Sequence, residues 1–259
     1  MSALRKIRAR PQKDIYFTRM TDKEKQKVVL ITGASRGIGK AIAENLAEKY
    51  SLILTARSEE ALNKVKSDLQ SAGARVEAFT ADLTSTKDIQ KLIESSIKAM
   101  GRVDVLVNNA GIGRFGRVDT LSEDDIRTVM DTNLMGPFLL TKAALPDMIA
   151  RKSGQIINIS SVAGLNGFKN GGAYAASKFA LNGFTECLRE DVKEFGIAVT
   201  AVCPGGVRTE FGGGPADVRD FVLEPSDVAH TVRYLIDESE TANTKLIELK
   251  PRRREQFRS

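Results

Sequence analysis

Tyr174 and Lys178 are four residues apart in the segment Tyr-Ala-Ala-Ser-Lys, and this spacing places both side chains on one face of a helix. A phenol with an unperturbed pKa of about 10 exchanges protons poorly at neutral pH. A neighbouring ammonium lowers that pKa because it stabilises the phenolate. The pair therefore predicts proton transfer to a carbonyl oxygen or from an alcohol, although the same spacing is also common on solvated helix faces.

A glycine-rich turn lies near the start of the chain. The apolar run 28–32 leads directly into Gly33, Gly37 and Gly39, and an amphipathic helical pattern follows. Glycines let the backbone approach a pyrophosphate, while the first helical turn supplies N–H groups and the positive end of the helix dipole. Strand, turn and helix together predict a dinucleotide site.

The cations beside this turn favour NADP(H) over NAD(H). The second strand, 52–56, is followed by Arg57, and no carboxylate occurs there before Glu59. An acidic residue would bind the ribose hydroxyls, whereas arginine accommodates a 2′-phosphate. Arg36, inside the glycine turn, is a second cation able to reach the same place.

Short β-branched runs alternate with amphipathic helical patterns along the chain. Strands are expected at 28–32, 52–56, 76–79, 103–107, 155–161, 197–203 and 245–249, and helices after the glycine turn, at 59–72, 86–100, after Ser122, from Tyr174 and from Ser226 to about 237. This alternation predicts an α/β fold with one doubly wound parallel sheet of about seven strands. Parallel strands end at one edge, so the residues that follow them should share a site.

Three local features refine this outline. Ser122 and Ser226 are the expected N-caps of their helices. Asn133 and the following Gly136 and Pro137 interrupt the helix after Ser122, and the proline predicts a bend there. Residues 210–224 are expected to form a loop and are a candidate for a mobile lid.

Composition and charge limit the function classes. The chain has 259 residues, 42% hydrophobic and 28% charged, which suits one soluble domain. Of its net charge of +6, residues 1–19 contribute +5 and residues 250–259 contribute +4, whereas the body between them carries −3. We therefore expect a basic extension at 1–26, the folded domain at 27–249 and a basic tail at 250–259, with no nucleic-acid or membrane partner. Only two cysteines, outside any metal-type spacing, predict reduced thiols and no metal site.

With these pieces in order, the chain resembles the short-chain dehydrogenase/reductase family over about residues 27–249. The likeness rests on several motifs in the family's order and spacing: Thr32-Gly33-x-x-x-Gly37-x-Gly39, Asn108-Asn109-Ala110-Gly111, Asn133, Ser161, Tyr174-x-x-x-Lys178 and Pro204-Gly205. Each motif alone is weak, but six in register are specific. The resemblance implies a Rossmann-type fold and an NADP(H)-dependent enzyme acting on CH–OH or C=O groups.

The resemblance also implies a role for each catalytic residue. Tyr174 is the general acid in reduction and the base in oxidation, and Lys178 holds the nicotinamide ribose and lowers the Tyr174 pKa. Ser161 polarises the substrate carbonyl, and Asn133 anchors a water that links Lys178 to solvent. The expected cofactor contacts are Gly33, Ser35, Arg36, Gly37, Ile38, Gly39, Arg57 at the 2′-phosphate, Asp82 at the adenine, Leu83, Asn108, Ala110, Gly111, Tyr174, Lys178, Pro204, Gly205, Val207 at the carboxamide, and Thr209.

The substrate is less constrained. The favoured reading is an NADPH-dependent reductase of a small ketone or aldehyde; the alternative is a 3-oxoacyl-carrier-protein reductase, whose acidic partner would suit Arg114, Arg117 and Lys169 near the mouth. Other alcohols, steroids and sugars remain open. A non-catalytic NADPH-binding scaffold is disfavoured because it needs no aligned acid, and a sugar-nucleotide epimerase usually needs a larger C-terminal domain.

The expected assembly and location follow from the same resemblance. Members commonly form dimers or tetramers through the helices that carry Asn133 and Tyr174, so a homodimer or homotetramer is expected. The substrate is a small carbonyl or alcohol, free or carried as a thioester. The expected location is cytoplasmic, with organelle targeting by the arginine-rich residues 1–19 left open.

Overall fold

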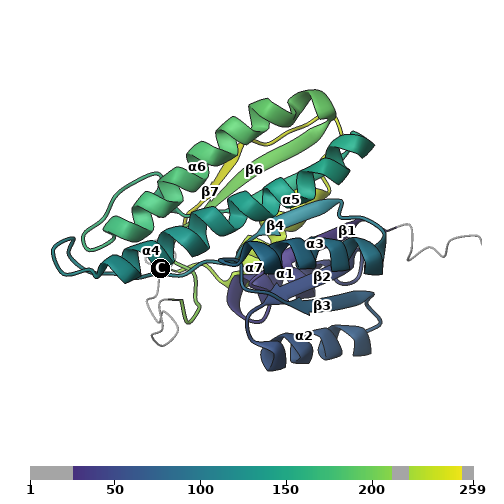
Figure 1. The fold of residues 1–259 in the computed structure, drawn as a ribbon, viewed down its shortest axis with the longest axis horizontal. Coiled ribbons are helices and arrows are strands. Elements are labelled where there is room, and N and C mark those ends of the chain that lie inside the picture. Colours follow the sequence, from purple (N-terminus) through teal and green to yellow (C-terminus); the bar gives the residue numbers. More distant parts are fainter. Residues whose placement is uncertain (1–25, 212–221, 253–259) are drawn as a thin grey trace, which may run out of the picture.

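A seven-stranded parallel sheet runs through the middle of the computed structural model, which describes residues 26–211 and 222–252 (Figure 1). Its order is β3-β2-β1-β4-β5-β6-β7. The strands are β1 (Val28–Thr32), β2 (Ser51–Ala56), β3 (Val76–Thr80), β4 (Val105–Asn108), β5 (Gly154–Ile159), β6 (Ile197–Pro204) and β7 (Leu246–Leu249). The order reverses between β1 and β4, which is the place where doubly wound sheets bind ligands.

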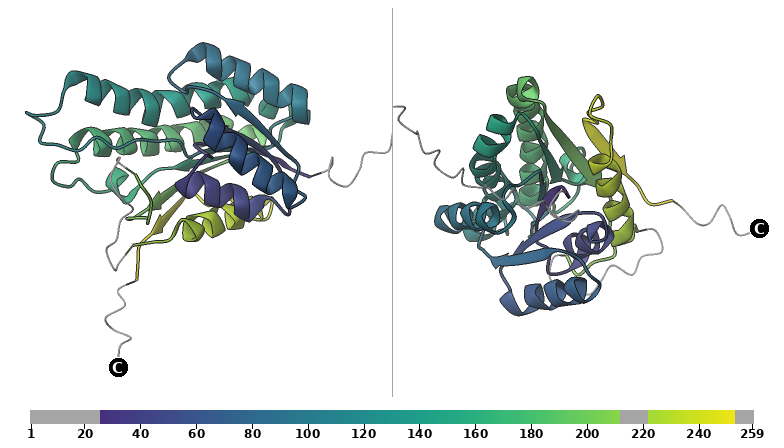
Figure 2. Two further views of the ribbon diagram at one scale, coloured as in Figure 1. Left: turned by 90° about the horizontal axis from the view of Figure 1, so that it is seen from below. Right: turned by 90° about the vertical axis from the view of Figure 1, so that its right-hand side faces the viewer.

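Helices cover both faces of this sheet (Figure 2). One face packs against α1 (Gly37–Leu46), α2 (Glu59–Ser71) and α7 (Pro225–Ile236), and the other against α3 (Thr86–Met100), α5 (Gly136–Arg151) and α6 (Gly172–Val192). The central strands are buried on both faces, which explains why their sequences read as unbroken apolar runs. The predicted α/β class and doubly wound sheet are therefore confirmed.

The helix boundaries confirm one expected cap and correct another. Ser122 caps α4 (Glu123–Met130) by accepting a hydrogen bond from the Asp125 amide, as predicted. The cap of α7 is Glu224 rather than Ser226. Glu224 and Asp227 exchange side-chain and backbone hydrogen bonds, and Pro225 occupies the first turn, where its missing N–H costs nothing.

The interruption near Asn133 is a π-helical turn, Asp131–Met135, that joins α4 directly to α5. Pro137 lies in the first turn of α5, and the irregular hydrogen bonding precedes it, so the expected bend at the proline is replaced by a wider turn at Asn133. Single π turns are common at functional sites. This one leaves the Asn133 side chain fully buried beside α6.

Several expectations concern residues outside the described ranges. Nearly all of the predicted N-terminal extension, most of the predicted lid at 210–224 and most of the basic tail lie there. The extension, the domain limits and the lid therefore stay predictions. No helix within 26–211 or 222–252 is both long and apolar enough to cross a membrane.

Two helical glycines give opposite stability predictions. A Cβ on Gly39 would lie 2.3 Å from the Gly33 carbonyl oxygen, whereas a Cβ on Gly183 in α6 would meet no atom within 4 Å. Gly39→Ala should lower the free energy of unfolding by about 1–3 kcal/mol. Gly183→Ala should raise it by about 0.4–1 kcal/mol because alanine loses less backbone entropy on folding. Urea denaturation measures both; equal effects would contradict the close approach at Gly39.

Candidate active site

Side chains and backbone from two neighbouring strands fix the glycine turn. The Thr32 hydroxyl accepts hydrogen bonds from the backbone amides of Asn109 and Ala110, each at 2.9 Å. The Asn109 side chain donates to the Thr32 carbonyl at 2.8 Å. Gly33 and Gly37 have positive φ values of 65° and 53°, which only glycine adopts without strain. The turn is thus pinned to the end of β4, and Asn109 is a site residue that the predicted contacts omitted.

The N-terminus of α1 suits an anion. Its N-cap residue, Arg36, makes no side-chain cap, and the first turn contains no acidic residue. Thr209, from the segment after β6, lies over this turn, since its Cγ2 is 3.3 Å from where a Gly37 Cβ would be. The predicted contacts Gly33, Gly37 and Thr209 therefore surround one helix N-terminus, a geometry that suits a pyrophosphate.

The two arginines that are predicted to bind the 2′-phosphate follow adjacent strands. Thr32 and Thr55 are paired in the sheet, so Arg36 and Arg57 follow neighbouring strand ends. Arg36 forms an ion pair with Glu210 at 3.5 Å, and both side chains are about 70% exposed, so the pair is weak and exchangeable. Arg57 is exposed after β2.

Asp82 lies on the neighbouring β3 side of this corner. Hydrogen bonds from the Thr84 backbone and hydroxyl hold the pKa of the Asp82 carboxyl below its usual value despite partial burial, and the Arg57 charge lowers it further. The carboxyl is therefore ionised at neutral pH and close enough to Arg57 to sense its charge. An arginine and an ionised carboxylate are therefore neighbours at this corner of the sheet edge.

Of the remaining residues predicted to contact the cofactor, two are buried in the core and the others lie at the carboxyl edge of the sheet. The Asn108 side chain is 2% exposed and donates to Thr141 and Asn158, so it links β4 to α5 and β5 and does not face the site edge. Leu83 is buried against the start of α5. The others lie in the segments at the carboxyl edge: Ser35, Ile38, Gly39, Ala110, Gly111, Pro204, Gly205 and Val207.

Tyr174 and Lys178 lie in the first turns of α6, as their spacing predicts. The Lys178 amine is 5.9 Å from the centre of the Tyr174 ring and donates to the Ile159 carbonyl at 2.9 Å. Gly111 lies close to Asn133 and Lys178, because a Cβ there would be 3.2 Å from the Asn133 side-chain oxygen and 3.6 Å, an ordinary contact distance, from the Lys178 amine. The end of β5 therefore holds the Lys178 amine by a hydrogen bond, and α6 determines where the Tyr174 phenol lies.

Burial dominates the proton affinities of this pair. It lowers the pKa of Lys178 to about 8, with a smaller opposing effect from the Cys203 thiol. It raises the pKa of the Tyr174 phenol, and a hydrogen bond with Ser161 only partly opposes that rise. The expected lowering of the Tyr174 pKa by Lys178 is therefore contradicted. Desolvation disfavours both charged forms, and the phenol stays protonated at neutral pH.

Ser161 and Asn133 reach the pair from either side. The Ser161 hydroxyl accepts a hydrogen bond from the Ala163 amide at 3.1 Å and also bonds to the Tyr174 phenol. The two hydroxyl groups are therefore close enough to contact one ligand oxygen. The Asn133 side chain accepts from the Ile112 amide at 2.8 Å and donates to the Ile112 carbonyl at 2.9 Å. It also donates to Ser177, so its side chain holds the loop after β4 against α6.

Three aromatic rings that are absent from the predicted site lie beside the Tyr174 ring, at the opening of the candidate active site. The Tyr174 ring centre is 5.6 Å from that of Phe115 and 5.5 Å from that of Phe211. Phe168 joins them through Phe115 at 6.1 Å. The three phenylalanines lie in separate irregular segments, where no periodicity signals their meeting.

The cations at the mouth are already partnered in two of three cases. Arg114 pairs with Asp125 at 3.1 Å, and Arg117 pairs with Asp119 at 2.8 Å. Of the predicted contacts to an acidic carrier protein, Lys169 alone has no ion pair within the described ranges. Within those ranges, no three His, Cys, Asp or Glu side chains are grouped so that they could hold a metal ion.

Comparisons with known proteins agree with this geometry. The family model for short chain dehydrogenases matches residues 27–216. The sepiapterin reductase of Chlorobaculum tepidum is 36% identical over 214 residues, covering 79% of this chain and 88% of that protein. The 3-oxoacyl-[acyl-carrier-protein] reductase of Synechocystis sp. is 36% identical over 218 residues, covering 81% and 88%. A metagenomic short-chain oxidoreductase solved in complex with NADP gives a TM-score of 0.78 at 36% identity, covering 88% and 97%.

The buried lysine makes stability depend on pH. Between pH 8 and its ordinary pKa of 10.5, Lys178 is neutral in the folded state and charged in the unfolded chain, so unfolding binds a proton and stability rises with pH. Lys178→Met should therefore be more stable than wild type at pH 7, by roughly 2 kcal/mol after the lost hydrogen bond is counted. The difference should shrink by pH 9.5.

Urea denaturation at the two pH values measures this difference. Lys193→Met is the matched control, because Lys193 is exposed at the other end of α6 and pairs with Glu190. A Lys178→Met difference that stays constant from pH 7 to 9.5 would contradict the lowered pKa.

Proposed function

The chain belongs to the short chain dehydrogenase family, and we propose that it reduces the carbonyl of a small ketone or aldehyde with NADPH, reversibly, at Tyr174. The observation that carries this proposal is the meeting of the Tyr174 phenol, the Ser161 hydroxyl and the Lys178 amine beside the glycine turn. A site that only bound the cofactor would need no proton donor aligned there. Relatives that act on carbonyl groups and neighbours solved with NADP support the same class.

The glycine turn and its neighbours fit a dinucleotide. The uncapped N-terminus of α1 would hold the pyrophosphate, and Arg36 and Arg57 would bind the 2′-phosphate, with Arg36 exchanging Glu210 for it. Asp82 would accept from the adenine amino group. Lys178, with one donor on the Ile159 carbonyl, has further N–H groups for the nicotinamide ribose. When bound, the cofactor supplies the hydride.

Tyr174 would give its proton to the carbonyl oxygen as negative charge develops there. Its raised pKa keeps the phenol protonated at neutral pH, which is the form that reduction requires. Ser161 would donate a second hydrogen bond to the same oxygen and so stabilise the developing charge. Burial strengthens both interactions, because little water competes for the oxygen.

A free small carbonyl is favoured over an acyl group on a carrier protein. Arg114 and Arg117 are paired with Asp125 and Asp119, so the net positive charge that an acidic partner would meet there is reduced, although these exposed pairs can exchange, as the ion pair at the glycine turn can. The 3-oxoacyl-carrier-protein reductase remains the second candidate, supported by the relative from Synechocystis sp.. Turnover of acetoacetyl thioesters against vicinal diketones, pterins and aldehydes separates the two.

Tyr174→Phe should lower kcat with the best carbonyl substrate by about 10² to 10⁴, because general acid catalysis is lost while the ring remains. NADPH consumption measures the rate, and NADPH fluorescence should show cofactor affinity unchanged. Tyr234→Phe, an exposed tyrosine on α7, is the matched control. Full activity in Tyr174→Phe would refute the catalytic assignment.

Arg57→Asp should shift the ratio of kcat/KM from NADPH toward NADH by about tenfold or more, since the 2′-phosphate loses a cation and meets a carboxylate. Steady-state kinetics with both cofactors measures this ratio. Lys64→Asp makes the same charge change on an exposed position of α2 and should leave the ratio unaltered. An unchanged ratio in Arg57→Asp would defeat the 2′-phosphate assignment.

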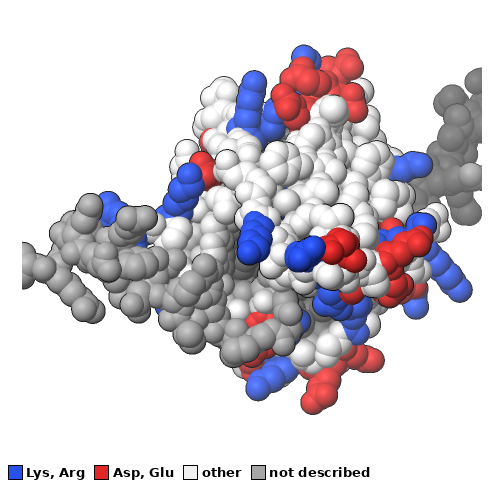
Figure 3. Space-filling view, turned by 90° about the vertical axis from the view of Figure 1, so that its left-hand side faces the viewer, with Lys and Arg blue, Asp and Glu red and all other residues white. Residues whose placement is uncertain are grey.

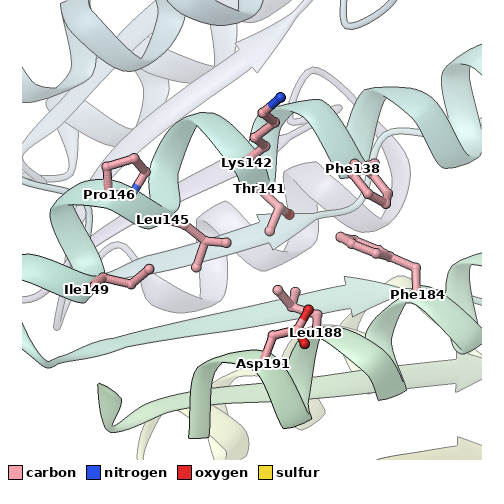
Figure 4. Close-up of a pocket in the computed structure, with 9 residues that line it drawn as sticks. All are labelled: Phe138, Thr141, Lys142, Leu145, Pro146, Ile149, Phe184, Leu188 and Asp191. Atoms are coloured by element: carbon pink, nitrogen blue, oxygen red, sulfur yellow. The ribbon is translucent and has the colours of Figure 1, made fainter. Parts of the chain in front are cut away.

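The outer face of α5 and α6 is the proposed contact between copies of the chain. A cavity of about 250 Å³ lies between these helices, with Phe138 and Phe184 stacked at 4.4 Å across it (Figure 4). Lys142 and Asp191 lie on its two sides, so a second copy could offer complementary charges. Phe138 is 42% exposed, and such apolar surface suits an oligomer interface.

Phe138→Glu should convert a dimer or tetramer to a smaller species, because it places a charge in the apolar contact. Light scattering after size-exclusion chromatography measures the mass. Tyr234→Glu, on exposed α7, is the control and should keep the wild-type mass. A wild-type mass in Phe138→Glu would exclude this face.

A further inference from the structure

Three phenylalanines from three different loops meet over the catalytic phenol. Phe115 follows β4, Phe168 precedes α6 and Phe211 follows β6. Phe115 is the centre of the group, since its ring lies 5.6 Å from Tyr174, 6.1 Å from Phe168 and 6.5 Å from Phe211. The planes are tilted or edge-on, as aromatic rings prefer. We call Phe115, Phe168 and Phe211 the aromatic cluster.

The backbone is adapted to this arrangement. A Cβ on Gly113 would lie 2.6 Å from the Phe115 ring, and a Cβ on Gly171 would lie 2.3 Å from the Phe168 ring. The two loops are also joined, because the Gly116 amide donates to the Asn170 carbonyl at 2.9 Å and Gly116 pairs with Gly171. The rings are therefore held back against their own loops and do not extend freely into solvent.

The aromatic cluster nevertheless keeps much of its surface exposed. Phe115, Phe168 and Phe211 are 48%, 49% and 43% exposed, beside a Tyr174 ring that must reach its substrate. Rings recruited only for stability would be more fully buried. The exposed ring surface next to a proton donor is therefore surface that a ligand can cover.

Of the three cations near the aromatic cluster, only Lys169, which follows Phe168, has no ion pair within the described residues. Arg114 and Arg117 are paired with Asp125 and Asp119. The end of the molecule at which these loops project has a broad uncharged area, with charged side chains mostly around it (Figure 3). The chemistry offered beside Tyr174 is that of flat, polarisable rings.

We propose that the aromatic cluster selects carbonyl compounds whose C=O is attached to a planar aromatic or conjugated ring, the ring packing against Phe115 and Phe211 while the oxygen meets Tyr174. This inference rests on the proposed carbonyl reduction. A planar ring gains offset or edge contacts with these phenylalanines that a puckered saturated ring of equal size cannot make. Specificity then arises from ring shape and polarisability, not from a charged group.

The test compares acetophenone with cyclohexyl methyl ketone, which have the same number of heavy atoms, using NADPH and the full chain. Their intrinsic reactivities differ, so the measured quantity is the change in their kcat/KM ratio between wild type and variant. Phe115→Leu should shift that ratio about tenfold against acetophenone. Phe115→Tyr, which keeps the ring, should retain the wild-type ratio. Tyr234→Leu, which removes an exposed ring on α7, should retain both the ratio and the rates.

A second measurement covers binding without turnover. Benzamide and cyclohexanecarboxamide resemble the two ketones and are not reduced, so calorimetry on the NADPH-loaded protein gives their affinities. If benzamide binds more tightly than cyclohexanecarboxamide and this difference disappears in Phe115→Leu, the result supports the role of the aromatic cluster. If neither ketone is turned over, that result counts against the proposed reduction and not against the aromatic cluster. Turnover of both ketones with an unshifted ratio in Phe115→Leu, or equal binding of the two amides, overturns the inference.

Discussion

A buried amine constrains the rest of the site. Lys178 is 4% exposed, and an ammonium removed from water is costly unless the surrounding groups bond to it. The Ile159 carbonyl at the end of β5 provides that bond, and Gly111 in the loop after β4 packs close to the amine. The end of β5, the loop after β4 and the first turns of α6 must therefore keep fixed positions, which also fixes the direction of the Tyr174 phenol.

The fold could be predicted because its signals are local. Central parallel strands read as apolar runs, and the helices between them have apolar positions at helical spacing, so the α/β class and the doubly wound parallel sheet could be predicted. Ser122 was predictable for the same reason, since a cap depends on the next three residues. Glu224 was not, because its reciprocal bonds with Asp227 replaced the more usual serine two residues later.

The site was predictable in position but only partly in chemistry. The spacing of Tyr174 and Lys178 predicted that they lie together. Whether the pKa of the phenol is raised or lowered depends on burial by distant segments, which no local pattern reveals. The Asn108 side chain is turned into the core by Thr141 and Asn158, partners from other elements. The aromatic cluster combines three irregular loops, so its existence depends entirely on tertiary structure.

The π turn between α4 and α5 has a geometric consequence for the whole substrate side. It holds one residue more than an α-helical turn, so α4 is rotated by roughly 100° about the axis relative to an uninterrupted helix. α5 packs on the sheet, whereas α4 and the loop before it extend beyond the sheet. A change of one residue in the length of α4 would therefore turn the exposed residues of α4 around the axis while the packing of α5 on the sheet is kept. The π turn thus sets which α4 side chains face the substrate side, independently of how α5 packs on the sheet.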